Sequence, residues 1–174
     1  QHLDLGHNSL GDEGVKVVGA HLSKKIHFLN LSENKIGDEG AKALAAHLPP
    51  KLRRLNLMHN NIGVKGAKAI GANLPQKLQC VNLANNQIGD KGAKAIVTHL
   101  PPTLSALHLS SNKITTEGAK VVVPLLPLGL QKLTVWGNEI AFEVYRMIDD
   151  RLIYARVDKD PEDREDQGTE EEEE

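Results

Sequence analysis

A period of 26 residues is the feature that most constrains this 174-residue chain. Asparagines, glycines and leucines each recur at that step without a slip. The asparagines are Asn8, Asn34, Asn60, Asn86, Asn112 and Asn138, the glycines are Gly14, Gly40, Gly66, Gly92 and Gly118, and the leucines are Leu22, Leu48, Leu74, Leu100, Leu126 and Leu152. A fixed period of this length indicates a repeat architecture, in which each copy of one small unit packs against its neighbours in the chain.

Each unit contains two different hydrophobic spacings. Before the asparagine stand two apolar residues two positions apart, such as Leu29 and Leu31, and this spacing places both side chains on one face of a short strand. After the asparagine the spacing becomes helical, as in Ala41, Leu44 and Ala45. The pattern predicts one strand and one helix per unit. Because a single unit cannot bury its own apolar face, the core must form where units stack.

Polar residues at fixed places predict how each unit turns from strand to helix. The repeated asparagine amide is expected to hydrogen-bond to backbone groups of its own unit and the next unit. Asp12, Asp38, Asp90 and Thr116 stand at the expected helix starts, where they are predicted to cap their own helices. Val64 occupies the same place and cannot cap a helix. The repeated glycine suits a tight helix start and close packing.

Units such as LNLSENKIGDEGAKALAAHL (29–48) and LNLMHNNIGVKGAKAIGANL (55–74) resemble the ribonuclease-inhibitor-like class of leucine-rich repeats. The resemblance extends over residues 3–152, although the constant step of 26 differs from the inhibitor's own spacing. It implies an α/β solenoid, or horseshoe, of about six repeats, with a parallel sheet on the concave side and helices on the convex side. Similar repeats occur in nucleotide-binding immune receptors, in the activator of the Ran GTPase and in bacterial effectors.

Charge divides the chain into two parts. Residues 1–157 contain 19 basic and 12 acidic residues, a formal charge of +7, whereas residues 158–174 contain 2 basic and 11 acidic residues, a formal charge of −9. We therefore expect a repeat domain over 1–157, with the altered last unit as its C-terminal cap, and a disordered acidic tail over 158–174. Since no cap precedes Gln1, we also expect further repeats or a cap before this segment in the parent chain.

The candidate functional surface consists of the strand positions that are predicted to face away from the helices. These positions vary between units, and large side chains such as Phe28, Met58, Trp136 and Arg54 among them are of the kinds enriched at interface hot spots. The competing interpretations are that single exposed apolar residues are ordinary surface residues, and that Trp136 packs against the cap. The predicted partner-binding residues are Phe28, Asn30, Arg53, Arg54, Asn56, Met58, His59, His108 and Trp136.

The sequence contains no motif that predicts an enzyme, a cofactor or a metal site. It has no phosphate loop, no H-E-x-x-H and no G-x-S-x-G, and its histidines and single cysteine, Cys80, do not combine at metal-ligand spacing. One cysteine also argues against a disulfide scaffold, and no apolar run reaches membrane-spanning length. We therefore expect a cytoplasmic location, in the producing cell or, for a secreted effector, in a host cell.

The favoured function is that of a non-enzymatic module that binds a protein partner through its concave face. One alternative, based on the resemblance and the acidic tail, is a GTPase-activating protein of the Ran-activator type. A second alternative is the recognition part of a larger effector or enzyme whose catalytic domain lies outside this segment.

The predicted convex face carries regularly spaced charges. Glu13, Glu39, Glu117 and Glu143 each stand three residues before a Lys or Arg and are expected to form ion pairs along their helices. In the middle units, Lys65, Lys68, Lys91 and Lys94 form a basic convex patch, where the acidic tail is a candidate intramolecular ligand. Nucleic acid is not expected there, because the aromatic platform used by single-strand binders is missing.

Overall fold

The computed structural model describes residues 1–152, in which six strands alternate with six α-helices. The strands are β1 (His2–Asp4), β2 (Phe28–Asn30), β3 (Arg54–Asn56), β4 (Cys80–Asn82), β5 (Ala106–His108) and β6 (Lys132–Thr134). The helices are α1 (Gly11–Ala20), α2 (Asp38–Ala45), α3 (Val64–Ala72), α4 (Gly89–Val97), α5 (Thr116–Val122) and α6 (Phe142–Arg151), with a 3-10 turn η1 (Val123–Leu125). The expected domain end at residue 157 and the expected disordered tail, 158–174, lie outside the described residues.

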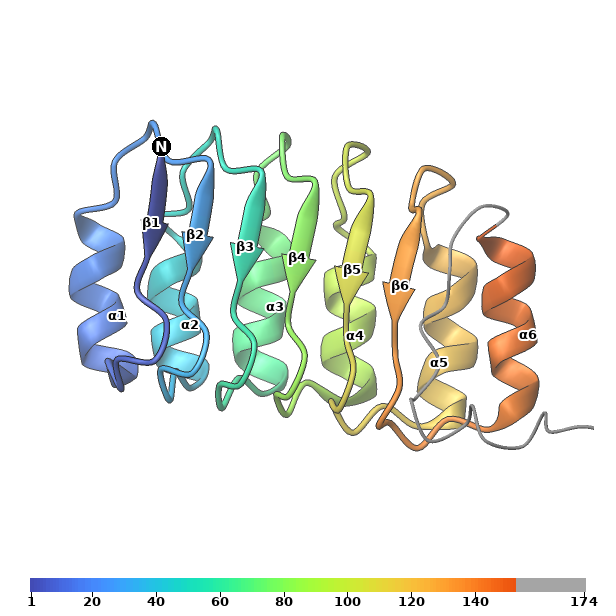
Figure 1. Ribbon diagram of the computed structural model, residues 1–174. Coiled ribbons are helices and arrows are strands. Elements are labelled where there is room, and N and C mark those ends of the chain that lie inside the picture. Colours follow the sequence, from blue (N-terminus) through green and yellow to red (C-terminus); the bar gives the residue numbers. More distant parts are fainter. Residues whose placement is uncertain (153–174) are drawn as a thin grey trace, which may run out of the picture.

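The strands form one parallel sheet in the order β1-β2-β3-β4-β5-β6. Neighbouring strands pair with an offset of one sequence period, so that Leu29 lies beside Leu55, and Leu55 beside Val81. All six helices lie behind one face of this sheet, and each runs antiparallel to its strand (Figure 1). This arrangement confirms the predicted α/β leucine-rich repeat solenoid.

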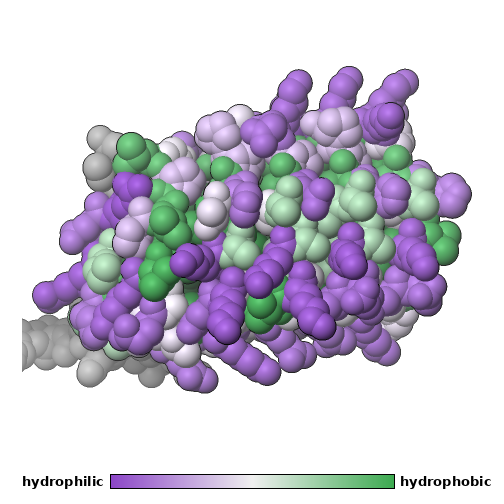
Figure 2. Space-filling view, turned by 180° about the vertical axis from the view of Figure 1, so that it is seen from behind, coloured by the Kyte–Doolittle hydropathy of each residue, from purple (hydrophilic) through white to green (hydrophobic). Residues whose placement is uncertain are grey.

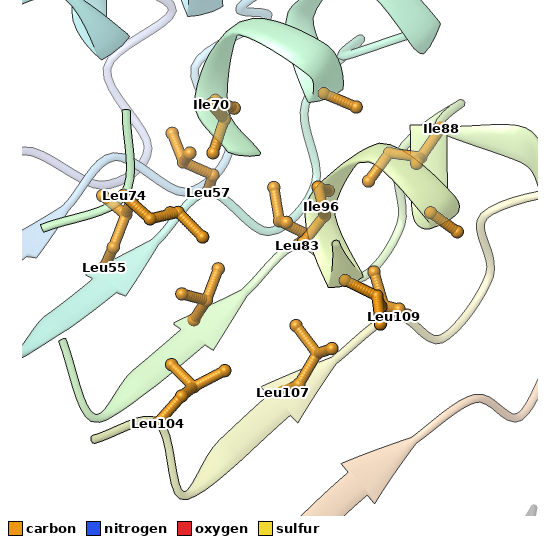
Figure 3. Packing of buried hydrophobic residues seen from close by; sticks show 14 of the residues in the cluster. Leu55, Leu57, Ile70, Leu74, Leu83, Ile88, Ile96, Leu104, Leu107 and Leu109 are labelled. Carbon is orange, nitrogen blue, oxygen red and sulfur yellow. The ribbon is translucent and has the colours of Figure 1, made fainter. Parts of the chain in front are cut away.

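The core is a series of aliphatic layers between the sheet and the helices. The inward strand residues Leu31, Leu57, Leu83 and Leu109 are all 0% exposed. They pack against helix residues such as Ile70 and Ile96, and each layer contacts the next along the stack (Figure 3). In the first repeat the equivalent leucines, including Leu3, are only half-buried, because no described repeat covers their outer side.

The repeated asparagines form a hydrogen-bonded ladder between repeats. The Nδ2 group of Asn60 donates to the carbonyl oxygens of Leu57, in its own repeat, and Leu31, in the preceding repeat, each at 3.0 Å. Its Oδ1 accepts from the backbone N–H groups of Asn34 at 3.1 Å and Ile36 at 2.9 Å. The predicted direction was wrong: the amide reaches the preceding repeat rather than the next, because the turn after β2 leaves its polar groups facing Asn60.

We predict that Asn60→Ala lowers the free energy of unfolding by about 2–4 kcal/mol, because several buried backbone groups lose their partners at once. Urea unfolding followed by circular dichroism measures the change. Asn61→Ala is the matched control, since Asn61 is the exposed neighbour and its substitution is expected to cost less than about 0.5 kcal/mol. Equal losses in the two variants would contradict the ladder's structural role.

The acidic residues at the helix starts cap the helix of the following repeat, so the prediction that they cap their own helices was wrong. Asp38 is the first residue of α2, and its Oδ1 accepts from the N–H groups of Gly63 and Gly66 at the start of α3, both at 2.8 Å. The same interaction joins Asp12 to Gly37, Asp90 to Thr115 and Thr116 to Ala141. An Asp inside the first turn cannot reach its own free N–H groups, but it lies beside those of the next helix.

Helices that lack this carboxylate begin differently. α4 follows the repeat with Val64, and α1 has no described repeat before it. Both begin at a glycine in the left-handed region, Gly11 with φ +62° and Gly89 with φ +60°. Their N–H groups donate to the backbone carbonyls of Asn34 and Asn112, each at 2.8 Å. A helix start that receives no cap from the preceding repeat thus bonds to the backbone of the following repeat instead.

The cross-repeat cap also explains part of the glycine column. A Cβ at Gly118 would overlap the carboxylate of Asp90, and a Cβ at Gly66 would lie 2.9 Å from Asp38 Oδ1. A side chain at these two positions would therefore displace the cap, whereas at Gly14 and Gly92 it would instead crowd Leu10 and Ile88.

We predict that Asp38→Ala costs about 1–2 kcal/mol of folding stability, the usual range for a lost helix cap, although the substituted residue lies outside the helix that it stabilises. Thermal and urea unfolding measure the loss. Glu39→Ala is the control, because Glu39 is exposed on the same turn and caps no helix. A loss no larger than that of the control would show that the hydrogen bonds from Asp38 to the next repeat do not contribute to folding stability.

The convex face is mostly hydrophilic, with small and apolar residues between the charged rows (Figure 2). Of the four predicted ion pairs along helices, all within the described residues, only Glu117 with Lys120 forms, at 3.1 Å. The prediction was wrong for the other three pairs. Exposed long side chains gain little from such pairs and lose rotamer freedom on forming them, so most remain apart.

Candidate functional site

The concave face of the sheet is the surface on which the predicted partner-binding residues lie. No described helix covers this face, which is turned toward the viewer in Figure 1. Because the strands pair in register, equivalent residues form columns across the sheet: Phe28 lies beside Arg54, and Arg54 beside Cys80. The sheet thus presents ordered rows of variable side chains.

Seven of the nine predicted residues come together on two neighbouring strands and the segments that flank them. We call this cluster the β2–β3 patch; it consists of Phe28, Asn30, Arg53, Arg54, Asn56, Met58 and His59. His108 on β5 and Trp136 after β6 lie further along the stack, about 14 Å from β3 to β6 at the usual strand spacing. The structure therefore divides the predicted set into one contiguous patch and two outlying residues.

The β2–β3 patch combines apolar and cationic groups. Phe28 and Met58 are half-buried, whereas Arg53, Arg54 and His59 are exposed. The Phe28 ring lies 5.5 Å from the ring of His2, at an interplanar angle of 54°, so one side of it packs on the preceding strand. The patch offers hydrophobic contact area with guanidinium groups beside it.

The two asparagines of the patch also have a local structural role that was not predicted. Asn30 Oδ1 accepts from the backbone N–H of Ser32 at 3.1 Å, and Asn56 Oδ1 accepts from that of Met58, also at 3.1 Å. Asn82 makes the same turn with Ala84. The signal was present in the sequence, because an Asx residue recurs in this column and such side chains commonly bond to the backbone two residues further on. These oxygens shape the strand ends.

His59 belongs to a second structural column, the residue just before each ladder asparagine. All six members have positive φ, from 51° at Ser111 to 67° at Gly137, and His59 has φ 54°. The chain bends there from the sheet toward the helix layer. His59 therefore lies at the rim of the concave face. At the other end of the sheet, His108 Nδ1 lies 3.0 Å from Thr134 Oγ1.

Cys80 occupies the concave column between Arg54 and the later strands. Burial raises the pKa of its thiol, and the nearby charges of Arg54 and Lys132 only partly oppose that effect. The protonated thiol is a weak nucleophile, so this position contributes a small apolar surface. Within residues 1–152, no three His, Cys, Asp or Glu side chains gather as metal ligands.

A second charged surface adjoins the patch where the strands begin. We call it the basic edge; it consists of Lys24, Lys25, Lys51, Arg53, Arg54, Lys77 and Lys132. The segments that carry these residues, 21–28, 47–54, 73–80 and 125–132, contain no Asp or Glu. His27 lies among them, and its pKa is lowered by desolvation, the N-terminal amine, Arg53, Lys51 and His2. Desolvation is the largest cause of the lowered pKa, and the neighbouring positive charges add to it.

We predict that Arg53→Gln raises the pKa of His27 part of the way to its ordinary value, because one repelling charge is removed while desolvation remains. An NMR titration of the His27 ring measures it, and Lys65→Gln is the matched control far from His27. Since the folded state binds this proton less readily than the unfolded chain, folding stability decreases as the pH falls through the ordinary His range. An unchanged pKa would contradict the charge assignment.

Comparison with known proteins identifies the class. The family model described as "Leucine Rich repeat" matches residues 1–19, 23–45, 49–71, 75–97 and 101–123, which is more than half of the chain. The chain therefore belongs to the leucine-rich repeat family. Repeats of this family generally serve protein–protein interaction. The search of curated proteins found no match.

Two solved structures share the fold. The actin-binding site 2 of leiomodin-1 is 16% identical with a TM-score of 0.53, and the match covers 88% of this chain and 79% of that one. The second is a chain from the Rad7–Elc1 complex in yeast, 17% identical with a TM-score of 0.69, for which the match covers 85% of this chain and 39% of that one. At these identities the likeness concerns the fold. No helix within residues 1–152 is long and apolar enough to cross a membrane.

Proposed function

We propose that the chain binds a protein partner on its concave face, and that the β2–β3 patch is the centre of that interface. The observation that carries the proposal is the register of the sheet, which places Phe28 beside Arg54 on a face that no described helix covers, with Met58 following just after β3. A partly buried aromatic ring, a thioether and a guanidinium form the kind of cluster that dominates interface energetics.

The chemistry of the patch indicates what the partner presents. Phe28 and Met58 need an apolar surface to gain from burial, and Arg54 beside Phe28 needs a carboxylate or carbonyl group. The side-chain oxygens of Asn30 and Asn56 already accept hydrogen bonds in the strand-end turns, so these residues define the shape of the surface and are poor acceptors for a partner. A protein segment with an apolar side chain next to an acidic one satisfies these conditions.

The fold neighbours agree with this type of function. Leiomodin-1 is described through an actin-binding site, and the other neighbour is a chain of the complex of Rad7 and Elc1. Both titles concern protein partners, which supports a protein partner for this chain without indicating which one. Binding of a protein partner requires no catalytic residue.

We predict that Arg54→Glu combined with Met58→Asp abolishes capture of the partner and leaves the fold intact, because both side chains reach solvent from the sheet. Affinity capture from a lysate of the source organism, with quantitative mass spectrometry, compares this variant with the native chain. The matched control, Lys68→Glu with Val121→Asp, makes the same changes of charge and polarity on exposed helix positions. Proteins retained by the control and lost from the concave variant support the proposal; equal retention by both contradicts it.

The two alternatives stay predictions. A role as a GTPase activator rests on the resemblance of the repeats and on the acidic segment. A role as the recognition part of a larger effector or enzyme concerns residues beyond this segment. We also propose a cytoplasmic location, because the sequence contains a single cysteine, and disulfide-rich chains are typical of oxidising compartments.

A further inference from the structure

The basic edge gathers like charges, and in the described part of the molecule no ion pair neutralises five of them, Lys25, Lys51, Lys77, Arg53 and Arg54. Lys25, Lys51 and Lys77 recur at the 26-residue step, so they stack on successive repeats, where neighbouring strands lie about 4.8 Å apart. Like charges at such spacing repel each other. Within residues 1–152, the carboxylates that form ion pairs engage His7 and Lys120, and none engages Arg53, Arg54 or these three lysines.

The opposite edge of the sheet has the reverse character. Asp12, Glu13, Asp38, Glu39 and Asp90 all lie in the first turns of helices, which begin where the strands end. Lys65 and Lys91 stand at helix starts, and Asp149 and Asp150 stand at the end of α6, but otherwise acids predominate at one edge and lysines and arginines at the other.

The chain leaves the described structure at the basic edge. Each helix runs antiparallel to its strand, so every helix ends at the edge where the next strand begins (Figure 1). The last helix, α6, ends at Arg151, and Arg151 donates to the carbonyl of Leu126 near the end of α5. Residues 158–174, with their formal charge of −9, thus follow within six residues of Leu152.

We infer that the acidic C-terminal segment of this chain, residues 158–174, binds the basic edge of its own solenoid. Residues 153–174 can extend to about 70 Å, several times the distance of about 14 Å between β6 and β3, so acidic residues of the segment can reach Arg53 and Lys51 from Leu152 at the end of α6. The pairing neutralises the stacked lysines and covers one flank of the β2–β3 patch at Arg54. It holds whether or not the concave face binds a partner.

The basic edge suits the acidic segment better than the basic convex patch that the sequence suggested. Lys91 and Lys94 line a surface hollow together with Asp90 and Glu117, so carboxylates already lie among these lysines. The edge segments contain no acid. A segment with 11 acidic residues meets less repulsion at the edge.

The test uses the full-length chain with a paramagnetic label. In a Cys80→Ser background, Thr169→Cys carries a nitroxide, and NMR records the attenuation of backbone amide signals. At low ionic strength the amides of residues 51–54 are expected to lose about half of their intensity or more, because ion pairs are weakly screened there. In 1 M NaCl, where the screening length is about 3 Å, the loss should disappear.

Two charge-reversal variants make the result specific. Lys51→Glu with Arg53→Glu and Lys77→Glu should abolish the attenuation. Lys65→Glu with Lys68→Glu and Lys91→Glu, a matched triple change on the convex patch, should leave it intact. Circular dichroism of each variant confirms that the repeats stay folded.

Four outcomes would overturn the inference. They are attenuation centred on the convex lysines, attenuation that is equal in the two triple variants, attenuation that grows with protein concentration and so arises between copies, and binding of a single-stranded oligonucleotide to an edge whose amides the label does not attenuate. The last outcome would identify a nucleic-acid site instead of an intramolecular one.

Discussion

The hydrogen bonds from each ladder asparagine to the turn of the preceding repeat are the interaction on which the rest of the structure depends. The strands are only three residues long, at the lower end of the usual range, so each contributes few backbone bonds to the sheet. The ladder adds buried bonds at the point where each strand ends, such as those from Asn86 to Leu57, in the preceding repeat, and to Leu83. It also holds the residue before each asparagine in the left-handed conformation, which costs a non-glycine residue about 1–2 kcal/mol. Register, turn and core layer therefore depend on one amide per repeat.

The 26-residue period alone was sufficient to predict the architecture, because every repeat has apolar residues at the same positions. Leu57, Leu83 and Ile96 were assigned to the core by spacing, and each is fully buried. The cap contacts were missed for a physical reason. Asp38 stands beside the start of its own helix in the sequence, but its partner Gly63 lies 25 residues away and becomes adjacent only after the repeats stack. A pattern within one repeat cannot predict such a bond. The repeat that has Val64 in place of the Asp is followed by α4, which begins differently, and this shows that a helix start depends on the repeat before it.

The candidate site was predictable as a surface but only partly as a set of contacts. The sheet face and the cluster around Arg54 follow from alternation along the strands and from the register between them. The turn roles of Asn30 and Asn56 were not anticipated, since these residues were grouped with the variable positions even though Asx residues recur in that column. The partner's identity depends on side chains of another molecule. The residues of this chain therefore indicate the chemical groups that a partner must present, and not which protein the partner is.

The separation of charge between the two edges follows from the same stacking. Because each helix runs antiparallel to its strand, every helix N-terminus lies at one edge, where carboxylates are favoured by the free N–H groups and the helix dipole. That preference accounts for Asp12, Asp38 and Asp90, which also cap across repeats. At the strand-start edge, the segments before β2, β3 and β4 contain no acids, and Lys25, Lys51 and Lys77 form one column there. A solenoid repeats a local preference of a few tenths of a kcal/mol in most of its units, with α3, which has no acid in its first turn, as an exception. The repetition builds a charged surface that a single unit could not produce.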